Sequence, residues 1–208
     1  MIHYFLDGDV GYDYRSSWML HMPGVELVHW NCRNIPLDEY PELIKFVDEK
    51  KYSVLSDFVR RWAVYKHGGI YLDFDVELVR PIDQLFELYS FVCIEGLPIY
   101  ANAAVTGGIS GNKHHLAMLD DYLDVIRGNK GVSTSIEIEV GPKSATDYVT
   151  KIKGEPLDQK DLINVNRYDG LITLPKRYFY PFNWNESFSP DCVTQDTLGI
   201  HWWKKGWG

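Results

Sequence analysis

The stretch GGIYLDFDVE, residues 68–77, decides what kind of protein this chain can form. Two glycines lead into the apolar run 70–72, and Asp73, Asp75 and Glu77 follow at alternate positions. Because alternate residues of a strand share one face, the pattern predicts three carboxylates on one side of the end of a buried strand. Unpaired carboxylates beside a buried run are costly. The sequence therefore predicts that a positive charge lies next to them.

A divalent cation is the positive charge that fits this arrangement best. Carboxylate oxygens favour Mg²⁺ or Mn²⁺, and a site with few protein ligands leaves positions for water and phosphate oxygens. The alternative, two solvated carboxylates just past the strand, stays open. A second Asp-x-Asp, Asp7-Gly8-Asp9, lies in a turn-forming stretch without the EF-hand pattern after it. The pair Asp73 and Asp75 is thus the predicted cation site, with a diphosphate-bearing substrate.

The helix predicted over residues 54–66 places two charged side chains near this stretch. Its apolar residues recur at helical spacing, and Asp57 and Arg60 lie one turn apart on a different face. One interpretation is a solvated face. The other is a partly covered face, where the carboxylate meets a ribose hydroxyl and the guanidinium meets phosphate. Both stay open on geometry alone.

The chain's last ten residues, GIHWWKKGWG, offer a further ligand. They place His201 among three tryptophans, followed by Lys204 and Lys205. Imidazole suits Mn²⁺ and the lysines suit phosphate, whereas a structural histidine in an aromatic core is the ordinary alternative.

Composition limits the class of protein. With 208 residues the chain is long enough for one domain with a sizeable core, and 1–208 is predicted to be a single domain. A net charge of −8 argues against nucleic acid as a partner. Three widely spaced cysteines and the absence of a long apolar run predict a cytoplasmic protein without a transmembrane segment. A lipid-linked acceptor would add peripheral contact with the inner face of the membrane.

Predicted strands alternate with predicted helices along the chain. The expected strands are 2–6, 25–30, 70–72, 77–79, 90–95, 103–109 and 171–174. The expected helices are 14–20, 41–50, 54–66, 113–127 and the weakly patterned 144–151. Residues from 175 onward are expected to be irregular. The pattern predicts an α/β fold.

The order of motifs resembles glycosyltransferase family 32, the Asp-x-Asp sugar transferases that include α-1,6-mannosyltransferases and capsular-polysaccharide transferases. SDFVRRWAVYKHGGIYLDFDVELVRPID, residues 56–83, carries the long, specific part of the match. IHYF at 2–5, WN at 30–31, NAAVTG at 102–107 and the late Ile-His-x-Trp at 200–203 follow the same order. The resemblance implies a GT-A fold, the Rossmann-like fold of nucleotide-diphospho-sugar transferases, with a mixed central sheet.

The resemblance also implies contacts with a nucleotide-sugar. Asp57 corresponds to a ribose or sugar contact, Arg60 to a sugar and phosphate contact, and Tyr71 to a residue on the nucleotide side. Asn102 corresponds to an asparagine near the donor sugar, and Trp203 joins the same set.

For the metal, Mn²⁺ or Mg²⁺, the resemblance implies Asp75 as the direct ligand and His201 as a late metal or phosphate contact. Asp73 corresponds to the carboxylate that reaches the ribose and metal-bound water. Asp73 and Asp75 are the implied catalytic pair, and Glu77 is left as a structural or supporting residue.

Two departures from the family pattern concern the donor. Leu6-Asp7-Gly8 stands where the family has Trp-x-Gly, so an aromatic partner for the base must come from elsewhere. Gly206-Trp207 stands where the family has Ser-Trp, which removes a hydroxyl from the metal or phosphate side.

Taken with the predicted cation site, the resemblance implies a retaining, metal-dependent hexosyltransferase of surface polysaccharide synthesis. Its donor would be a UDP- or GDP-sugar, and its acceptor a glycan or lipid-linked saccharide. The alternatives are a nucleotidyl- or phosphotransferase and an inactive nucleotide-sugar-binding module.

Overall fold

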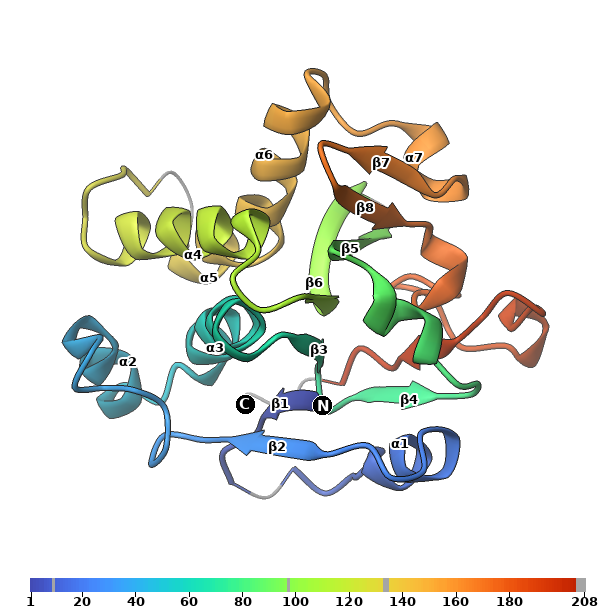
Figure 1. Cartoon of the computed structure of the whole chain (residues 1–208), viewed down its shortest axis with the longest axis horizontal. Coiled ribbons are helices and arrows are strands. Elements are labelled where there is room, and N and C mark those ends of the chain that lie inside the picture. The colour runs from blue at the N-terminus through green and yellow to red at the C-terminus, as the bar shows by residue number, and fades with distance from the viewer. Residues whose placement is uncertain (9, 97, 133–134, 205–208) are drawn as a thin grey trace.

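A mixed seven-stranded sheet forms the centre of the computed structural model, which describes every residue except 9, 97, 133–134 and 205–208 (Figure 1). Its strands are Ile2–Phe5 (β1), Leu27–Trp30 (β2), Gly69–Leu72 (β3), Ser90–Glu95 (β5), Tyr100–Gly108 (β6), Asn166–Tyr168 (β7) and Leu171–Leu174 (β8). They lie in the order β2-β1-β3-β6-β5-β8-β7. β1 is parallel to β2 and β3, whereas β6 is antiparallel to both of its neighbours.

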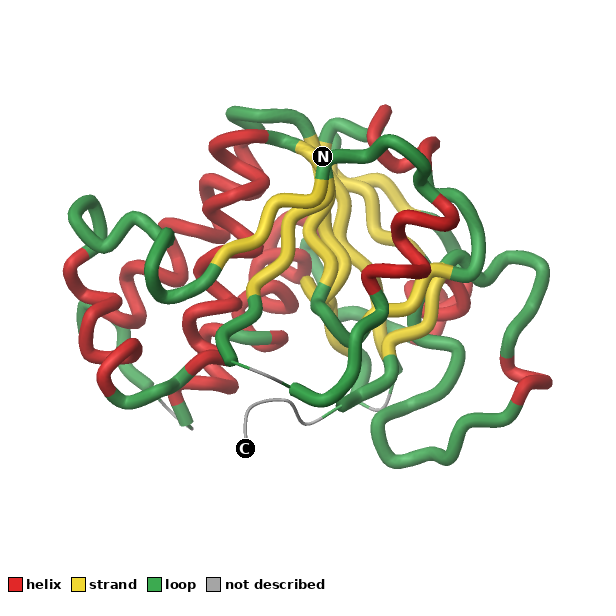
Figure 2. Tube along the Cα trace, turned by 90° about the horizontal axis from the view of Figure 1, so that it is seen from below, coloured by secondary structure: helices red, strands yellow, loops and turns green. Residues whose placement is uncertain are grey.

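Helices cover the sheet unevenly. The α-helices are Arg15–His21 (α1), Ile44–Asp48 (α2), Tyr52–His67 (α3), Lys113–Ile126 (α4), Ile136–Val140 (α5), Pro142–Lys153 (α6) and Gln159–Ile163 (α7). Short 3-10 helices span Pro41–Leu43, Asp83–Glu87, Lys176–Tyr178 and Pro190–Cys192. Most helical turns gather on one side of the strands, and loops with a few short helices cover the other (Figure 2).

The two faces of the sheet bury separate apolar cores because side chains alternate along each strand. On β3, Ile70 and Leu72 pack into the core that contains Trp18 of α1. Tyr71, between them, packs on the opposite face against α3 and α4.

Gly68 and Gly69 end α3 and start β3 where the backbone has left-handed φ angles of 70° and 92°. A β-carbon on Gly69 would approach the Met1 carbonyl oxygen to 2.5 Å, so only glycine lets β3 lie this close to the start of β1. The glycine pair therefore sets where β3 begins, four residues before Asp73.

A second, two-stranded antiparallel sheet pairs Val76–Leu78 (β4) with Gly199–His201 (β9). The prediction that residues 175–208 are irregular is therefore wrong for β9 and for the two 3-10 helices of this region. β9 is only three residues long, and its hydrogen-bonding partner lies far away in the sequence, so no local pattern reveals it.

Most other predicted elements are present within one to three residues of their predicted ends. The sequence did not predict α5, α7 or β7, each of which spans five residues or fewer. Among the described residues, none of the helices combines the length and apolarity that a membrane crossing needs.

Candidate functional site

Asp73 and Asp75 lie in the turn between β3 and β4. The Asp73 N–H donates to the Ala104 carbonyl oxygen (2.8 Å), and the Val76 N–H donates to the Asp73 carbonyl oxygen (2.9 Å). The prediction that Asp73, Asp75 and Glu77 crowd one side of the end of a strand is therefore wrong for Glu77, because the two aspartates lie in the turn and Glu77 lies in the next strand. Its carboxylate accepts from the Trp202 indole N–H (2.9 Å), a structural role of the kind expected for it.

Strand β9 carries His201 to this turn. In the β4–β9 pairing His201 lies opposite Val76. Just after β9, the Trp202 N–H donates to the Asp75 carbonyl oxygen (3.1 Å), and the Lys204 N–H donates to an Asp75 carboxylate oxygen (2.9 Å). The C-terminal segment is thus tied to Asp75 by both backbone and side-chain contacts.

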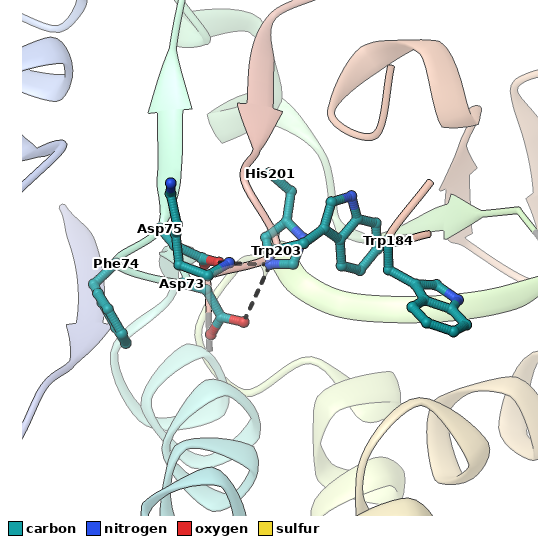
Figure 3. Close-up of a pocket in the computed structure, with 7 residues that line it drawn as sticks. Asp73, Phe74, Asp75, Trp184, His201 and Trp203 are labelled. Carbon is teal, nitrogen blue, oxygen red and sulfur yellow. Dashed lines mark hydrogen bonds and ion pairs between the residues drawn. The ribbon is translucent and has the colours of Figure 1, made fainter. Parts of the chain in front are cut away.

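Two carboxylates and one imidazole converge here (Figure 3). His201 Nε2 lies 3.2 Å from Asp75 Oδ1 and 3.9 Å from Asp73 Oδ2. One possible ligand atom from each residue lies within 4.8 Å of the others. Two hard oxygens with an imidazole nitrogen suit Mn²⁺ or Mg²⁺, so the residues fit the predicted metal. The cavity beside them has a volume of about 320 Å³, and its walls are Asp73, Phe74, Asp75, Trp184, His201, Trp203 and Lys204.

The charges of this cluster shift one another. Burial raises the pKa of Asp73 to about 6, with Arg60 opposing the shift and the neighbouring Asp75 carboxylate adding to it. Burial also disfavours ionised Asp75, but contact with His201 outweighs it and lowers the pKa of Asp75. Burial would lower the pKa of His201, yet the carboxylates of Asp75 and Asp73 raise it. Two acids held this close favour an added positive charge.

Arg60 lies behind the carboxylates, on α3. Its Nη2 donates to both Asp73 carboxylate oxygens (2.9 and 3.2 Å), and its Nη1 lies 3.3 Å from Asp57 Oδ1. Asp57 also meets Arg61, at 3.4 Å. The sequence left undecided whether this face of α3 is solvated or covered. It is buried, since Asp57 is 5% and Arg60 7% exposed. Asp57 is therefore engaged with two arginines, and Arg60 connects it to the cation cluster.

Tyr71 and Asn102 lie outside the walls of this cavity. Tyr71 is fully buried, and the Arg60 guanidinium lies over its ring, 5.4 Å from the ring centre. Tyr71 therefore packs against Arg60. The Asn102 amide donates to Glu95 (2.7 Å), and its side-chain oxygen accepts from the Ala104 N–H (2.8 Å). Ala104 is also the residue whose carbonyl holds Asp73. Asn102 thus shapes the strand that supports the Asp73 turn.

Trp203, for which the sequence predicts a role in nucleotide-sugar binding, lines the cavity. Its ring stands edge-on to His201, with centres 4.2 Å apart, and its φ of 56° is in the left-handed region. A bulky residue rarely adopts this conformation without support from its surroundings. Lys204 also lines the cavity, whereas Lys205, Gly206 and Trp207 lie outside the described residues.

Two wall residues had no assigned role in the sequence interpretation. Phe74 lies between the two aspartates, but an apolar residue inside the motif gave no chemical signal. Trp184 belongs to the aromatic-rich segment after residue 175, where no motif distinguished it from ordinary core residues.

Comparisons with known proteins agree with this geometry. Residues 9–92 match a family model described as "Glycosyltransferase sugar-binding region containing DXD motif". The chain is 32% identical over 102 residues to inositol phosphoceramide mannosyltransferase 3 of Schizosaccharomyces pombe. That match covers 47% of this chain and 26% of the mannosyltransferase, so it spans about a quarter of the relative's length.

The fold also resembles a solved structure, "PaToxG Glycosyltransferase", with a TM-score of 0.54 and 14% sequence identity. The likeness covers 72% of this chain and 68% of that one. Together with the mixed seven-stranded sheet, it confirms the predicted α/β fold of the GT-A type.

Proposed function

Because residues 9–92 match the model of a glycosyltransferase sugar-binding region that contains a DXD motif, in line with the family resemblance of the sequence, we propose that this protein transfers a hexose from a nucleotide-sugar. The proposed donor is a UDP- or GDP-sugar. The proposed acceptor is a saccharide, free or lipid-linked, in surface polysaccharide synthesis. The proposed reaction retains the anomeric configuration and depends on Mn²⁺ or Mg²⁺.

One observation carries this proposal. Asp73, Asp75 and His201 face one another in a single cavity, with Arg60 paired to Asp73 from behind. A site for a cation that also leaves room for phosphate oxygens is what a nucleoside-diphosphate leaving group needs. In the proposed function Asp75 and His201 hold the cation. When bound, it would act as a Lewis acid toward the charge that develops on the leaving diphosphate.

The chain's own residues prepare the site for that charge. The Lys204 N–H holds one Asp75 oxygen, which fixes the direction of the carboxylate. Arg60 favours ionised Asp73 despite its burial, as its opposition to the raised pKa shows. The side chain of Lys204, on the cavity wall, adds a positive charge suited to a phosphate oxygen.

The retaining course is inferred from the family resemblance. The acceptor hydroxyl oxygen bonds to the anomeric carbon on the face from which the phosphate leaves. The bond from that carbon to the phosphate oxygen breaks, and the leaving phosphate takes the hydroxyl proton. The products are a glycoside and a free nucleoside diphosphate.

A thermal-shift panel of UDP, GDP and their sugars, with Mn²⁺, Mg²⁺ or a chelator, tests the proposal. We expect at least one nucleotide to raise the melting temperature only when a divalent cation is present, and Asp75→Ala to abolish that rise. Asp147→Ala, which alters an exposed carboxylate on α6, is the matched control and should respond like wild type. Metal-independent responses throughout, or an unchanged Asp75→Ala response, would refute the metal–diphosphate site.

Product analysis then separates the reaction classes. Transfer of a sugar releases a nucleoside diphosphate, whereas nucleotidyl transfer releases pyrophosphate. No turnover with any donor, despite binding, would favour a binding module without activity.

A further inference from the structure

Trp184 is a large aromatic residue displayed at the mouth of the cation cavity. It is 63% exposed, yet it shares the cavity walls with Asp73, Asp75 and His201. Tryptophan usually buries most of its surface, so a wide exposed ring beside a polar cavity is a typical feature of ligand recognition.

The backbone holds Trp184 in a defined position. The Glu186 N–H donates to the Asn183 carbonyl oxygen (3.0 Å), and the Asn183 N–H donates to the Glu186 carboxylate (2.6 Å). These two bonds close the turn that carries Trp184. The Trp203 indole N–H donates to the Phe182 carbonyl oxygen (3.1 Å). The turn is thus tied to the tryptophan that packs against His201, which fixes Trp184 relative to the cation ligands.

Phe74 and Trp184 lie at opposite ends of the labelled cavity residues, with the two aspartates and His201 between them (Figure 3). The Phe74 ring stacks on Tyr12, with centres 5.4 Å apart and planes 23° apart. Tyr12 follows β1, and Phe74 follows β3, so both lie beyond the carboxyl ends of parallel strands. Nucleotides bind at that edge of α/β sheets. In the proposed function, the Phe74 end of the cavity would therefore take the nucleoside.

This division leaves the Trp184 end for the sugars. We propose that Trp184 is a stacking platform for a pyranose ring of the saccharide acceptor, an inference that rests on the proposed function. One face of a hexopyranose exposes several C–H groups, which suit the electron-rich face of an indole. Hydroxyls on the ring edge would remain free to point toward the cation cluster. Selection of pyranosides over acyclic polyols follows from that geometry.

Labelling the tryptophan indoles with ¹⁵N tests the platform directly. The Trp184 resonance is assigned by its loss in Trp184→Phe. The protein is saturated with Mg²⁺ and the nucleoside diphosphate that stabilises it, and then titrated with methyl α-D-mannopyranoside, methyl β-D-glucopyranoside and methyl β-D-galactopyranoside. We expect at least one glycoside to shift the Trp184 indole saturably, and D-mannitol, an acyclic polyol, to leave it unchanged.

Variants measure the contribution of the ring. Loss of a stacked aromatic in Trp184→Ala should weaken glycoside binding about tenfold, with Trp184→Phe within about threefold of wild type. Tyr89 is an exposed aromatic residue directly before β5 and outside the walls of the cation cavity, so Tyr89→Ala is the control and should bind the glycosides like wild type. Nucleoside-diphosphate affinity should change less than about twofold in Trp184→Ala, since the base lies at the Phe74 end.

The outcomes separate this inference from the proposed function. Wild-type protein that shows no Mg²⁺-dependent binding of any nucleoside diphosphate would overturn the proposed function. Normal nucleotide binding with a Trp184 indole that ignores every glycoside would overturn the platform alone. A Trp184 signal moved by the nucleotide itself, with affinity lost in Trp184→Ala, would also overturn it, since the ring would then contact the donor.

Discussion

Arg60 balances the charges beneath the cation cluster. It pairs with Asp57 on one side and Asp73 on the other, and all three groups are largely withdrawn from water. A buried pair is weak evidence for stability, but removing one partner leaves an uncompensated charge. The loss of stability on removing Arg60 therefore measures how much the cluster depends on a positive charge.

We expect Arg60→Ala to lower the free energy of unfolding by about 3–5 kcal/mol, because two buried carboxylates lose their common partner. A divalent cation should restore part of that loss by neutralising Asp73. Urea denaturation with chelator and with Mn²⁺ measures both effects. Arg127→Ala removes an exposed arginine from Glu42 and should cost less than about 1 kcal/mol. An Arg60→Ala protein that is as stable as the Arg127→Ala control would contradict this account.

At this scale the sequence predicted the chemistry better than the contacts. Asp73, Asp75 and His201 could be selected from residue type and motif, because carboxylates and imidazoles are common metal ligands, and the structure brings these three together. Helical spacing already places Asp57 beside Arg60 and Arg61, but the contact of Arg60 with Asp73, in the turn after β3, depends on tertiary packing, which no spacing rule contains. Trp184 could not be predicted at all, since its distinction is exposure beside the cavity and not its residue type.

The pairing of β4 with β9 positions the imidazole of His201. Gly199 begins β9, and a β-carbon there would lie 2.9 Å from the Glu77 carbonyl oxygen and 2.9 Å from the Phe179 ring. Both are tighter than a methyl group tolerates, so a side chain at this position must push β9 away from β4. The position of His201 therefore depends on a residue that has no side chain of its own.

Gly199→Ala should destabilise the protein by about 1–3 kcal/mol through overpacking. It should also weaken the Mn²⁺-dependent rise in melting temperature, because His201 moves with the strand. Gly131→Ala is the matched control, since a β-carbon at Gly131 has nothing within 4 Å. Titration of each variant with Mn²⁺ by thermal shift compares them, and equal Mn²⁺ responses would show that β9 does not set the site.

The start of α4 is attached to the sheet through a buried histidine. His115 contacts the hydroxyls of Ser90 (3.2 Å) and Thr106 (2.9 Å) and the side-chain oxygen of Asn112, which caps the helix. Burial lowers the pKa of His115 to about 3, with Arg61 and His114 adding to the shift. The unfolded chain takes up a proton near pH 6.5, whereas the folded chain resists it until about pH 3.

The contribution of His115 to stability should therefore be full above pH 6.5 and fall as the pH drops toward 3. The slope is at most about 1.4 kcal/mol per pH unit. His115→Gln should lower stability at neutral pH but flatten this slope. Denaturation at several pH values tests it, with His21→Gln at the end of α1 as the control. A variant that keeps the full wild-type slope would rule His115 out as its source.

Elements with a hydrophobic pattern of their own could be predicted from the sequence. Short elements that form only because a neighbouring strand pairs with them could not. α3 and α4 span several turns with apolar residues at helical spacing, and both were predicted. β7 and β9 are three residues each and exist because β8 and β4 lie beside them. Their formation is a consequence of the fold, so it follows from topology and not from local sequence.

The candidate site unites distant parts of the whole chain. α3 supplies Arg60, the β3–β4 turn supplies both aspartates, and the segment from β9 onward supplies His201 and the Lys204 N–H. These contacts join the far end of the described chain to the parallel half of the sheet. Ligand binding at the cluster should therefore stabilise the segment that follows β9 more than regions away from the site.

Hydrogen exchange followed by mass spectrometry tests this coupling. The Trp202 and Lys204 amides donate to Asp75, so opening of this segment breaks the cluster as it exposes them. At ligand concentrations near 100 times Kd, Mg²⁺ with a nucleoside diphosphate should slow their exchange by about 100-fold. A peptide over α6, which ends in its own helix cap at Gly154, should exchange unchanged. Asp75→Asn should remove the ligand-dependent slowing at residues 199–204. Equal slowing of both peptides in wild type would instead mean that the ligand stabilises the whole protein and not this segment in particular.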